Sequence, residues 1–251
     1  MRNESISPMN PVSGNVYRNY FLIGLFAVAM GALEAIVVVY LRQLYYPVGF
    51  DFPLTMLTSR MVSVEWLREA ATIAMLITIG MIAGRNSLQR FAWFLYCFAI
   101  WDIFYYIWLK LLLNWPASLL TWDILFLIPV PWVSPVLAPV VCSLTMILLA
   151  AVIIYLQRKN DSFRIQVVEW AIMIFGVIII LISFMWDYAS IIIKDGLLSK
   201  FWVLLNDTHL LSNILTFIPT TFSWGLFLTG EILILAAIAL MYRRSKLVTK
   251  Q

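Results

Sequence analysis

Ionisable side chains inside long apolar stretches are the residues of this sequence whose types could do chemistry. Each costs about 2.5–3.5 kcal/mol at the centre of a membrane helix, so such residues persist where they have a partner or a use. Carboxylates bind cations, carry protons or act as acids and bases, whereas arginine binds anions. The residues concerned are Glu34, Arg68, Glu69, Asp102, Glu169, Asp187 and Glu231.

The spacing of several of these residues places them on shared helix faces. Asp102, Tyr106 and Lys110 step by four and are expected to stack on one face of a helix. Glu34 and Arg42 are eight residues apart, which puts them two turns apart on one face. These spacings predict polar stripes inside the bundle.

A second group lies within one short stretch. Glu65 and Arg68 are three apart and are positioned to pair on one helix. Arg68 and Glu69 are adjacent, so they point in different directions, and we expect their partners to lie on other helices.

The elements that must hold these residues are membrane helices. Of the 251 residues 63% are hydrophobic and 12% are charged, against about 25% charged in soluble domains. Apolar stretches of about 20 residues predict transmembrane helices. We therefore expect an all-α, polytopic helix bundle with six spans. They are Tyr20–Leu41, Val62–Gly84, Phe91–Leu113, Ser134–Leu156, Val167–Ser190 and Phe222–Tyr242.

The spans form one transmembrane domain over residues 20–242, between a polar N-terminal segment (1–19) and a basic tail (243–251). The connection after the third span, Asn114–Trp132, is long and apolar. Its Leu119–Ile128 stretch is too short to cross a bilayer. We expect a re-entrant half-helix there, stopped by Pro129 and Pro131, because irregular backbone at membrane depth must be shielded by protein or by a wet cavity.

The distribution of lysine and arginine predicts the orientation. Eleven of these residues fall on the side that carries both termini, and six fall on the other side. The positive-inside rule then places both termini in the cytoplasm.

These observations predict a polar pocket that opens to the outer face. Its walls are the first, second, third and fifth spans, partly covered by the Trp115–Trp132 segment. The other interpretation stays open, in which the buried pairs only fix helix register. The candidate pocket residues are Glu34, Arg42, Arg68, Glu69, Asp102, Tyr106, Lys110, Asp123 and Asp187.

Several classes of site are not expected. The only histidine, His209, argues against haem and di-iron sites, which usually need several histidines. Cys97 and Cys142 lie in apolar segments and form no CxxC motif. We expect no metal and no cofactor, and, without a basic patch interleaved with aromatic residues, no nucleic-acid partner.

Three stretches resemble a known group of proteins. They are GALEAIVVVYLRQLYYP at 31–47, EWLREAATIAML at 65–76 and WDIFYYIWLKLLLNWPASLLTWDILFLIPVPW at 101–132. Together they are similar to a group of uncharacterised bacterial polytopic inner-membrane proteins, over roughly the first 140 residues. The resemblance implies a bacterial inner membrane and carries no activity.

Three functions remain open. The first, which we favour, is binding or transport of a small solute, proton or ion. In that case we also expect a homo-oligomer, because six spans are few for a transporter. The second is an intramembrane enzyme that acts on a lipid or lipid-linked substrate at the outer leaflet. Asp102, Glu69 and Asp123 would be its acid–base groups, and Arg68 or Lys110 would hold a phosphate or carboxylate. The third is a non-catalytic subunit of a membrane complex.

Overall fold

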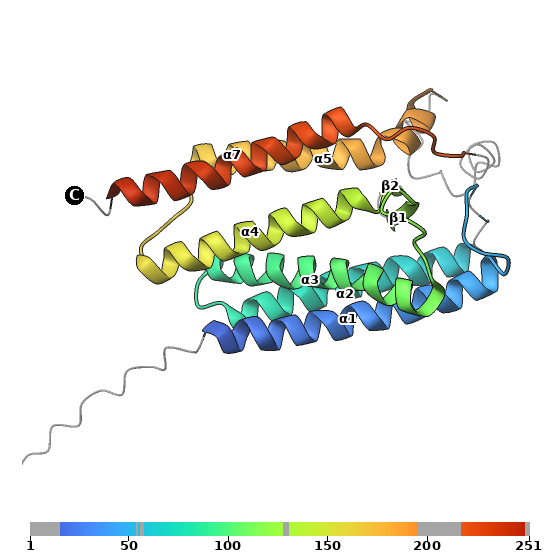
Figure 1. The fold of residues 1–251 in the computed structure, drawn as a ribbon, viewed down its shortest axis with the longest axis horizontal. Coiled ribbons are helices and arrows are strands. Elements are labelled where there is room, and N and C mark those ends of the chain that lie inside the picture. Colours follow the sequence, from blue (N-terminus) through green and yellow to red (C-terminus); the bar gives the residue numbers. More distant parts are fainter. Residues whose placement is uncertain (1–15, 54, 56–57, 128–130, 195–216, 249–251) are drawn as a thin grey trace, which may run out of the picture.

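Six long helices run side by side in the computed structural model, which describes residues 16–53, 55, 58–127, 131–194 and 217–248 (Figure 1). Each contains a window long and apolar enough to cross a membrane. The prediction of an all-α polytopic bundle with six spans is confirmed, and the chain is a multi-pass membrane protein. The helices are α1 (Val16–Tyr45), α2 (Ser59–Ala83), α3 (Ser87–Leu113), α4 (Leu137–Lys159), α5 (Val167–Lys194) and α7 (Trp224–Val248).

The connections gather at the two ends of the bundle (Figure 1). The start of α1, the α2–α3 and α4–α5 connections and the end of α7 lie together, at what we call the terminal end. The α1–α2 connection and the segment between α3 and α4 lie at the opposite end, which we call the hairpin end. Residues 1–15 and 249–251 of the expected terminal segments lie outside the described residues.

Helix α3 is the centre of one half of the bundle, because it packs against α1, α2 and α4. Helices α5 and α7 form the other half as a pair, and α7 also contacts α4. The α5–α7 approach is close: a Cβ added at Gly230 would lie 2.6 Å from the carbonyl oxygen of Gly176. Glycine at this crossing lets the two backbones approach, as small residues do in membrane helix pairs.

Local signals in the sequence explain where two of these helices begin and one ends. The Asn86 side chain accepts a hydrogen bond from Gln89 N (2.9 Å) at the start of α3. The Thr58 hydroxyl accepts one from Met61 N (3.3 Å) at the start of α2. Both satisfy an amide that the first helical turn leaves unpaired. Helix α3 ends at Leu113, and the next residue, Asn114, caps it with a left-handed φ of 52°.

The segment between α3 and α4 corrects one prediction. Where a half-helix was expected over Leu119–Ile128, the described residues form strand β1 (Trp122–Phe126), which pairs antiparallel with β2 (Trp132–Pro135). Backbone bonds from Val136 N and Leu137 N to carbonyls near the start of β1 extend the pairing. A hairpin satisfies its inner backbone groups between its own strands, so an apolar connection too short to span need not be helical.

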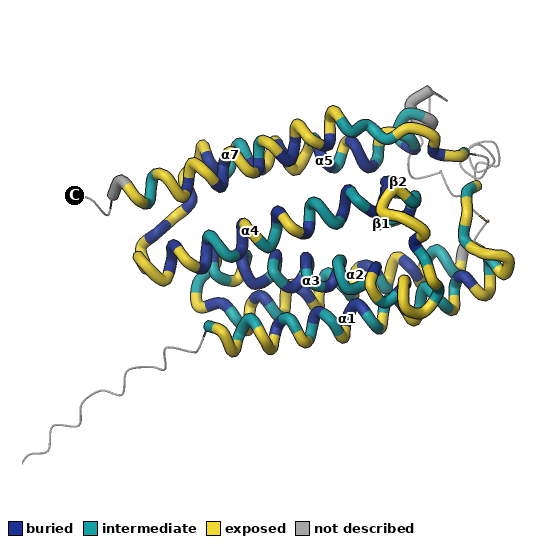
Figure 2. Tube along the Cα trace, in the orientation of Figure 1, coloured by how far each residue is buried: buried dark blue, intermediate teal, exposed yellow. Residues whose placement is uncertain are grey.

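The outward faces of the helices are apolar. Figure 2 shows exposed residues along the outside of the bundle, with buried ones facing inward. Large side chains such as Phe21, Leu33, Ile82, Val168 and Ile232 each expose more than 60% of their surface. Such an apolar exterior suits contact with lipid rather than water.

Candidate functional site

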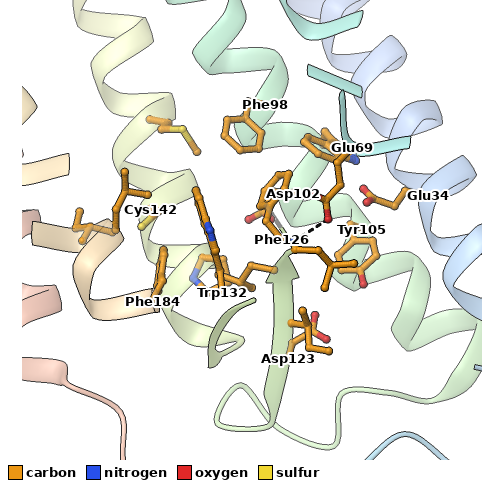
Figure 3. A pocket seen from close by; sticks show the side chains of 18 of the residues that line it. Glu34, Glu69, Phe98, Asp102, Tyr105, Asp123, Phe126, Trp132, Cys142 and Phe184 are labelled. Atoms are coloured by element: carbon orange, nitrogen blue, oxygen red, sulfur yellow. Dashed lines mark hydrogen bonds between the residues drawn. The ribbon is translucent and has the colours of Figure 1, made fainter. Parts of the chain in front are cut away.

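A cavity of about 640 Å³ lies inside the bundle, within the size range of small-molecule sites. Its lining comes from the six helices, the hairpin and the connection between α1 and α2. In Figure 3 the carboxyl groups of Glu34, Glu69 and Asp102 lie on one side of the cavity, with Cys142 and Phe184 on the other. We call the side with these three carboxyl groups the polar wall; a further carboxyl, that of Glu231 on α7, lines the cavity beside Cys142.

Arg68 joins two carboxylates in the polar wall. Its Nε donates to Glu65 Oε2 (2.8 Å), one turn earlier on α2, and its Nη1 donates to Glu34 Oε1 on α1. The predicted pairing of Glu65 with Arg68 is confirmed, and Arg68 also has the expected partner on another helix. With two anionic partners this guanidinium is already neutralised.

The second arginine of the cavity, Arg42, is held at the hairpin end. Its Nη2 lies 3.6 Å from Asp123 Oδ1 on β1, and both side chains are almost fully buried. The guanidinium carbon lies 3.7 Å from the Trp115 ring centroid and 4.4 Å from that of Phe50. Salt-bridge and cation–π contacts thus fix Arg42 under two aromatic rings.

Asp123 also lies beside Tyr106 of the central helix α3, whose hydroxyl lowers the pKa of its carboxyl. Burial raises the pKa of Asp123 to about 7, although the nearby positive charge of Arg42 acts in the opposite direction. This carboxyl therefore changes charge near neutral pH.

Three other carboxyls face the cavity without a cation from the described residues. Glu69 Oε1 on α2 accepts from Leu127 N (2.8 Å), just beyond β1, and Glu69 Oε2 has no hydrogen-bond partner in the described part of the chain. Asp102 Oδ2 on α3 accepts from Ser143 Oγ on α4 (2.8 Å). Glu231 Oε2 on α7 accepts from Thr145 Oγ1 (2.7 Å).

Aromatic rings line the cavity beside these carboxyls. Phe98 and Trp101 of α3 are stacked, with ring centroids 5.2 Å apart. Phe126 and Trp132 of the hairpin lie 5.3 Å apart, and Phe126 also meets Trp101 edge-on at 6.5 Å. Figure 3 shows the Trp132 ring between the carboxyl-bearing wall and Phe184. The hairpin thus closes one end of the cavity with aromatic surface.

The cavity continues as an apolar arm towards the terminal end. Its lining there consists of large apolar side chains of α3 and α5, including Phe91, Phe94, Met173, Ile174 and Val177. An elongated ligand with one polar end would match this division.

Seven of the nine predicted pocket residues line this cavity: Glu34, Arg42, Arg68, Glu69, Asp102, Tyr106 and Asp123. The structure places Lys110 and Asp187 outside the cavity lining. Lys110 Nζ instead donates to the carbonyls of Asn114 (3.3 Å) and Pro116 (3.0 Å), because a cation near a helix C-terminus finds unpaired carbonyls there.

Other residues that line the cavity were not among the predicted pocket residues. Glu231 was recognised as a charge within the last span, but α7 was not among the predicted walls. The free-energy cost of a carboxyl group inside the membrane is the signal that could have placed Glu231 in the site. Thr145 and the rings of Trp101 and Trp132 gave no comparable signal, because threonine and aromatic residues are common in membrane helices.

Comparisons with protein-family models, curated proteins and solved structures find no match to this chain. What the cavity can bind is therefore inferred from the positions and charges of the residues that line it. Among the described residues no group of three His, Cys, Asp or Glu side chains could hold a metal ion. The cavity has six carboxyl groups and two arginines, both already paired with carboxylates. Such a wall can accept hydrogen bonds or a positive charge, and it repels an anion.

Proposed function

We propose that this protein binds an amphipathic organic cation within the membrane and carries it across. The observation that supports this most directly is the division of the cavity. Carboxyl groups that have no cationic partner among the described residues lie beside aromatic rings at one end, and an apolar arm extends from them.

The charge balance favours a cation over an anion. Arg68 is bound by Glu34 and Glu65, and Arg42 by Asp123, so neither guanidinium is available without breaking an ion pair. A ligand ammonium near Glu69 or Asp102 would meet acceptors that form no salt bridge within the described part of the chain. An anionic group would face several carboxyls at short range, which costs free energy in a low-dielectric cavity.

The aromatic rings supply a second reason. A ligand cation over a tryptophan or phenylalanine face gains about 0.5–2 kcal/mol, and more when water is excluded. Trp101, Trp132, Phe98 and Phe126 line the cavity beside the carboxyls. The apolar arm would hold the body of the ligand.

The proposed transporter has a defined orientation in the membrane and exchanges protons for the cation. Basic residues are concentrated at the terminal end, which supports a cytoplasmic position for both termini and an outward hairpin end. Asp102 and Glu69 are the groups that would exchange protons for the cation. The resemblance of the sequence to bacterial inner-membrane proteins supports a bacterial inner membrane, and a dimer is the simplest assembly for six-span subunits.

The test uses two probes of similar shape and opposite charge, tetraphenylphosphonium and tetraphenylborate. Binding of each is measured by equilibrium dialysis against the full-length protein in nanodiscs, with empty nanodiscs subtracted. We expect saturable binding of tetraphenylphosphonium only. Asp102→Asn and Glu69→Gln should each weaken it by roughly tenfold, the equivalent of about 1.4 kcal/mol.

Asp187→Asn is the matched control, because Asp187 is a half-buried carboxyl in α5 that does not line the cavity. It should bind the probe as the unchanged protein does. Equal binding of both probes, or unchanged binding in Asp102→Asn and Glu69→Gln, would refute the proposal.

The enzymatic alternative has weaker support. It needs a cation to hold a phosphate or carboxylate, but Arg68 is neutralised by two carboxylates and Lys110 lies outside the cavity. Release of a cleaved product from added lipids, lost in Asp102→Asn, would favour the enzyme.

A further inference from the structure

A second pocket, of about 320 Å³, lies at the terminal end of the bundle, away from the hairpin. It is formed by the end of α4, the α4–α5 connection over residues 160–166, and the last turns of α7. We call it the terminal pocket. Figure 1 shows these three segments at the same end of the molecule.

The charge of the terminal pocket is opposite to that of the central cavity. Lys159, Arg164 and Arg244 line it, and none of the carboxylates in the described part of the chain does. Asp161, which lies in the same connection, is exposed and is not part of the lining. Lys159 and Arg164 are both exposed, so the pocket presents its positive charge at the surface of the terminal end.

One of these cations is fixed by the fold. Arg244 Nε and Nη2 donate to the two oxygens of Glu169 (2.8 and 2.9 Å), and Nη2 also donates to the Arg164 carbonyl (2.8 Å). Its guanidinium carbon lies 5.1 Å from the Phe163 ring centroid. Arg244 thereby ties α7 to the start of α5 and to the connection, which shapes the pocket.

The other two cations are not committed to a carboxylate. Lys159 and Arg164 form no ion pair with any described residue, and Arg164 Nη1 donates only to the carbonyls of Asp161 and Phe163. After Glu169 offsets Arg244, these two side chains leave a net positive charge. Leu156 and Ile165 supply an apolar floor next to them.

We propose that the terminal pocket binds the phosphate group of an anionic ligand, with Lys159 and Arg164 as its cationic partners. Guanidinium and ammonium groups together suit a phosphate, and each basic residue near a membrane surface contributes about 1 kcal/mol to binding anionic lipid. The phosphate belongs to a phospholipid head group or to a free phosphate compound. The apolar floor favours the lipid.

The experiment measures the affinity of the full-length protein, in a neutral detergent, for three probes. These are dihexanoyl phosphatidylglycerol, a diacylglycerol with the same two chains and no phosphate, and inorganic phosphate. We expect phosphatidylglycerol to bind at least fivefold more tightly than the diacylglycerol. Inorganic phosphate that binds as tightly as the lipid would identify a free phosphate as the source, and weaker binding would identify the lipid.

Variants test the assignment of residues. Lys159→Gln and Arg164→Gln should each weaken phosphatidylglycerol binding by roughly fivefold, whereas Lys159→Arg should retain it. Arg18→Gln is the matched control, because Arg18 is an exposed cation of α1 at the same end of the bundle. Unliganded melting temperatures verify that each variant is folded.

Two results would overturn the proposal. One is equal affinity for phosphatidylglycerol and the diacylglycerol, with no binding of inorganic phosphate. The other is phosphatidylglycerol binding that Lys159→Gln and Arg164→Gln leave unchanged.

Discussion

Arg68 of α2 donates a hydrogen bond to Glu34 of α1, and this ion pair joins two helices that each pack against α3. The same guanidinium also holds Glu65. A single arginine therefore compensates two carboxylates that are largely removed from water.

Removal of Arg68 should be more costly than removal of one of its partners. Arg68→Gln leaves Glu34 and Glu65 without a cation, and we expect a loss of about 3 kcal/mol in unfolding free energy, typical of a broken buried pair. Glu34→Gln should cost less, about 1 kcal/mol, because Glu65 still pairs with Arg68. Thermal and denaturant unfolding in nanodiscs measures both.

Arg60→Gln provides the control for this comparison, since Arg60 is an exposed arginine of α2. It should change the stability by less than about 0.5 kcal/mol. Equal losses for Arg60→Gln and Arg68→Gln would show that the Arg68 pairs contribute nothing specific.

The sequence was sufficient to predict the six spans and much of the polar wall. Span length and apolarity depend on the chain alone, and the Glu65–Arg68 pairing follows from helical spacing. Partners on other elements could not be predicted. The Leu127 amide, which donates to Glu69, lies 58 residues from it along the chain. Ser143, which donates to Asp102, lies 41 residues from it. Only tertiary packing brings the members of each pair together.

The hairpin was missed for a different reason. The Leu119–Ile128 stretch is short and apolar, and apolar length alone does not distinguish a half-helix from a strand. Two strands were indicated by the aromatic and β-branched residues in Trp122–Phe126 and Trp132–Pro135. Prolines lie between these two runs in the sequence, as expected for a turn.

Glu69 should anchor the hairpin to α2. Its Oε1 accepts the Leu127 amide, so Glu69→Leu removes the acceptor, whereas Glu69→Gln keeps an amide oxygen in its place. We expect faster amide hydrogen exchange over residues 122–127 in Glu69→Leu, by roughly tenfold, and little change in Glu69→Gln. If Glu69→Leu exchanged at the original rate, the hairpin would be held by other contacts.

The crossing of α5 and α7 should depend on the absence of a side chain at Gly230. A Cβ there would lie 2.6 Å from both the Gly176 carbonyl oxygen and Ile180 Cγ1, so Gly230→Ala must push the helices apart. We expect a loss of roughly 1–3 kcal/mol from this overpacking, measured as a lower melting temperature.

Gly225 is the matched control on the same helix, because a Cβ there meets nothing within 4 Å. Gly225→Ala should leave stability unchanged or raise it by up to about 1 kcal/mol, through the higher helix propensity of alanine. The interpretation of the crossing would be wrong if Gly230→Ala were as stable as Gly225→Ala.

Asp123 should titrate near neutral pH. Its carboxyl is protonated below its pKa of about 7 and ionised above it, so the salt bridge with Arg42 is complete only on the alkaline side. Infrared difference spectroscopy should show a protonated-carboxyl band that disappears as the pH rises, with a midpoint of about 7. This component should be absent in Asp123→Asn, which separates it from the other carboxyls.

Arg42→Gln gives the sign of the electrostatic contribution. The charge of Arg42 lowers the pKa of Asp123 against the larger effect of burial, so its removal should move the midpoint to a higher pH. A midpoint near 4 in the unchanged protein would mean that water reaches Asp123. A downward shift in Arg42→Gln would contradict the pairing of these two residues at the hairpin end.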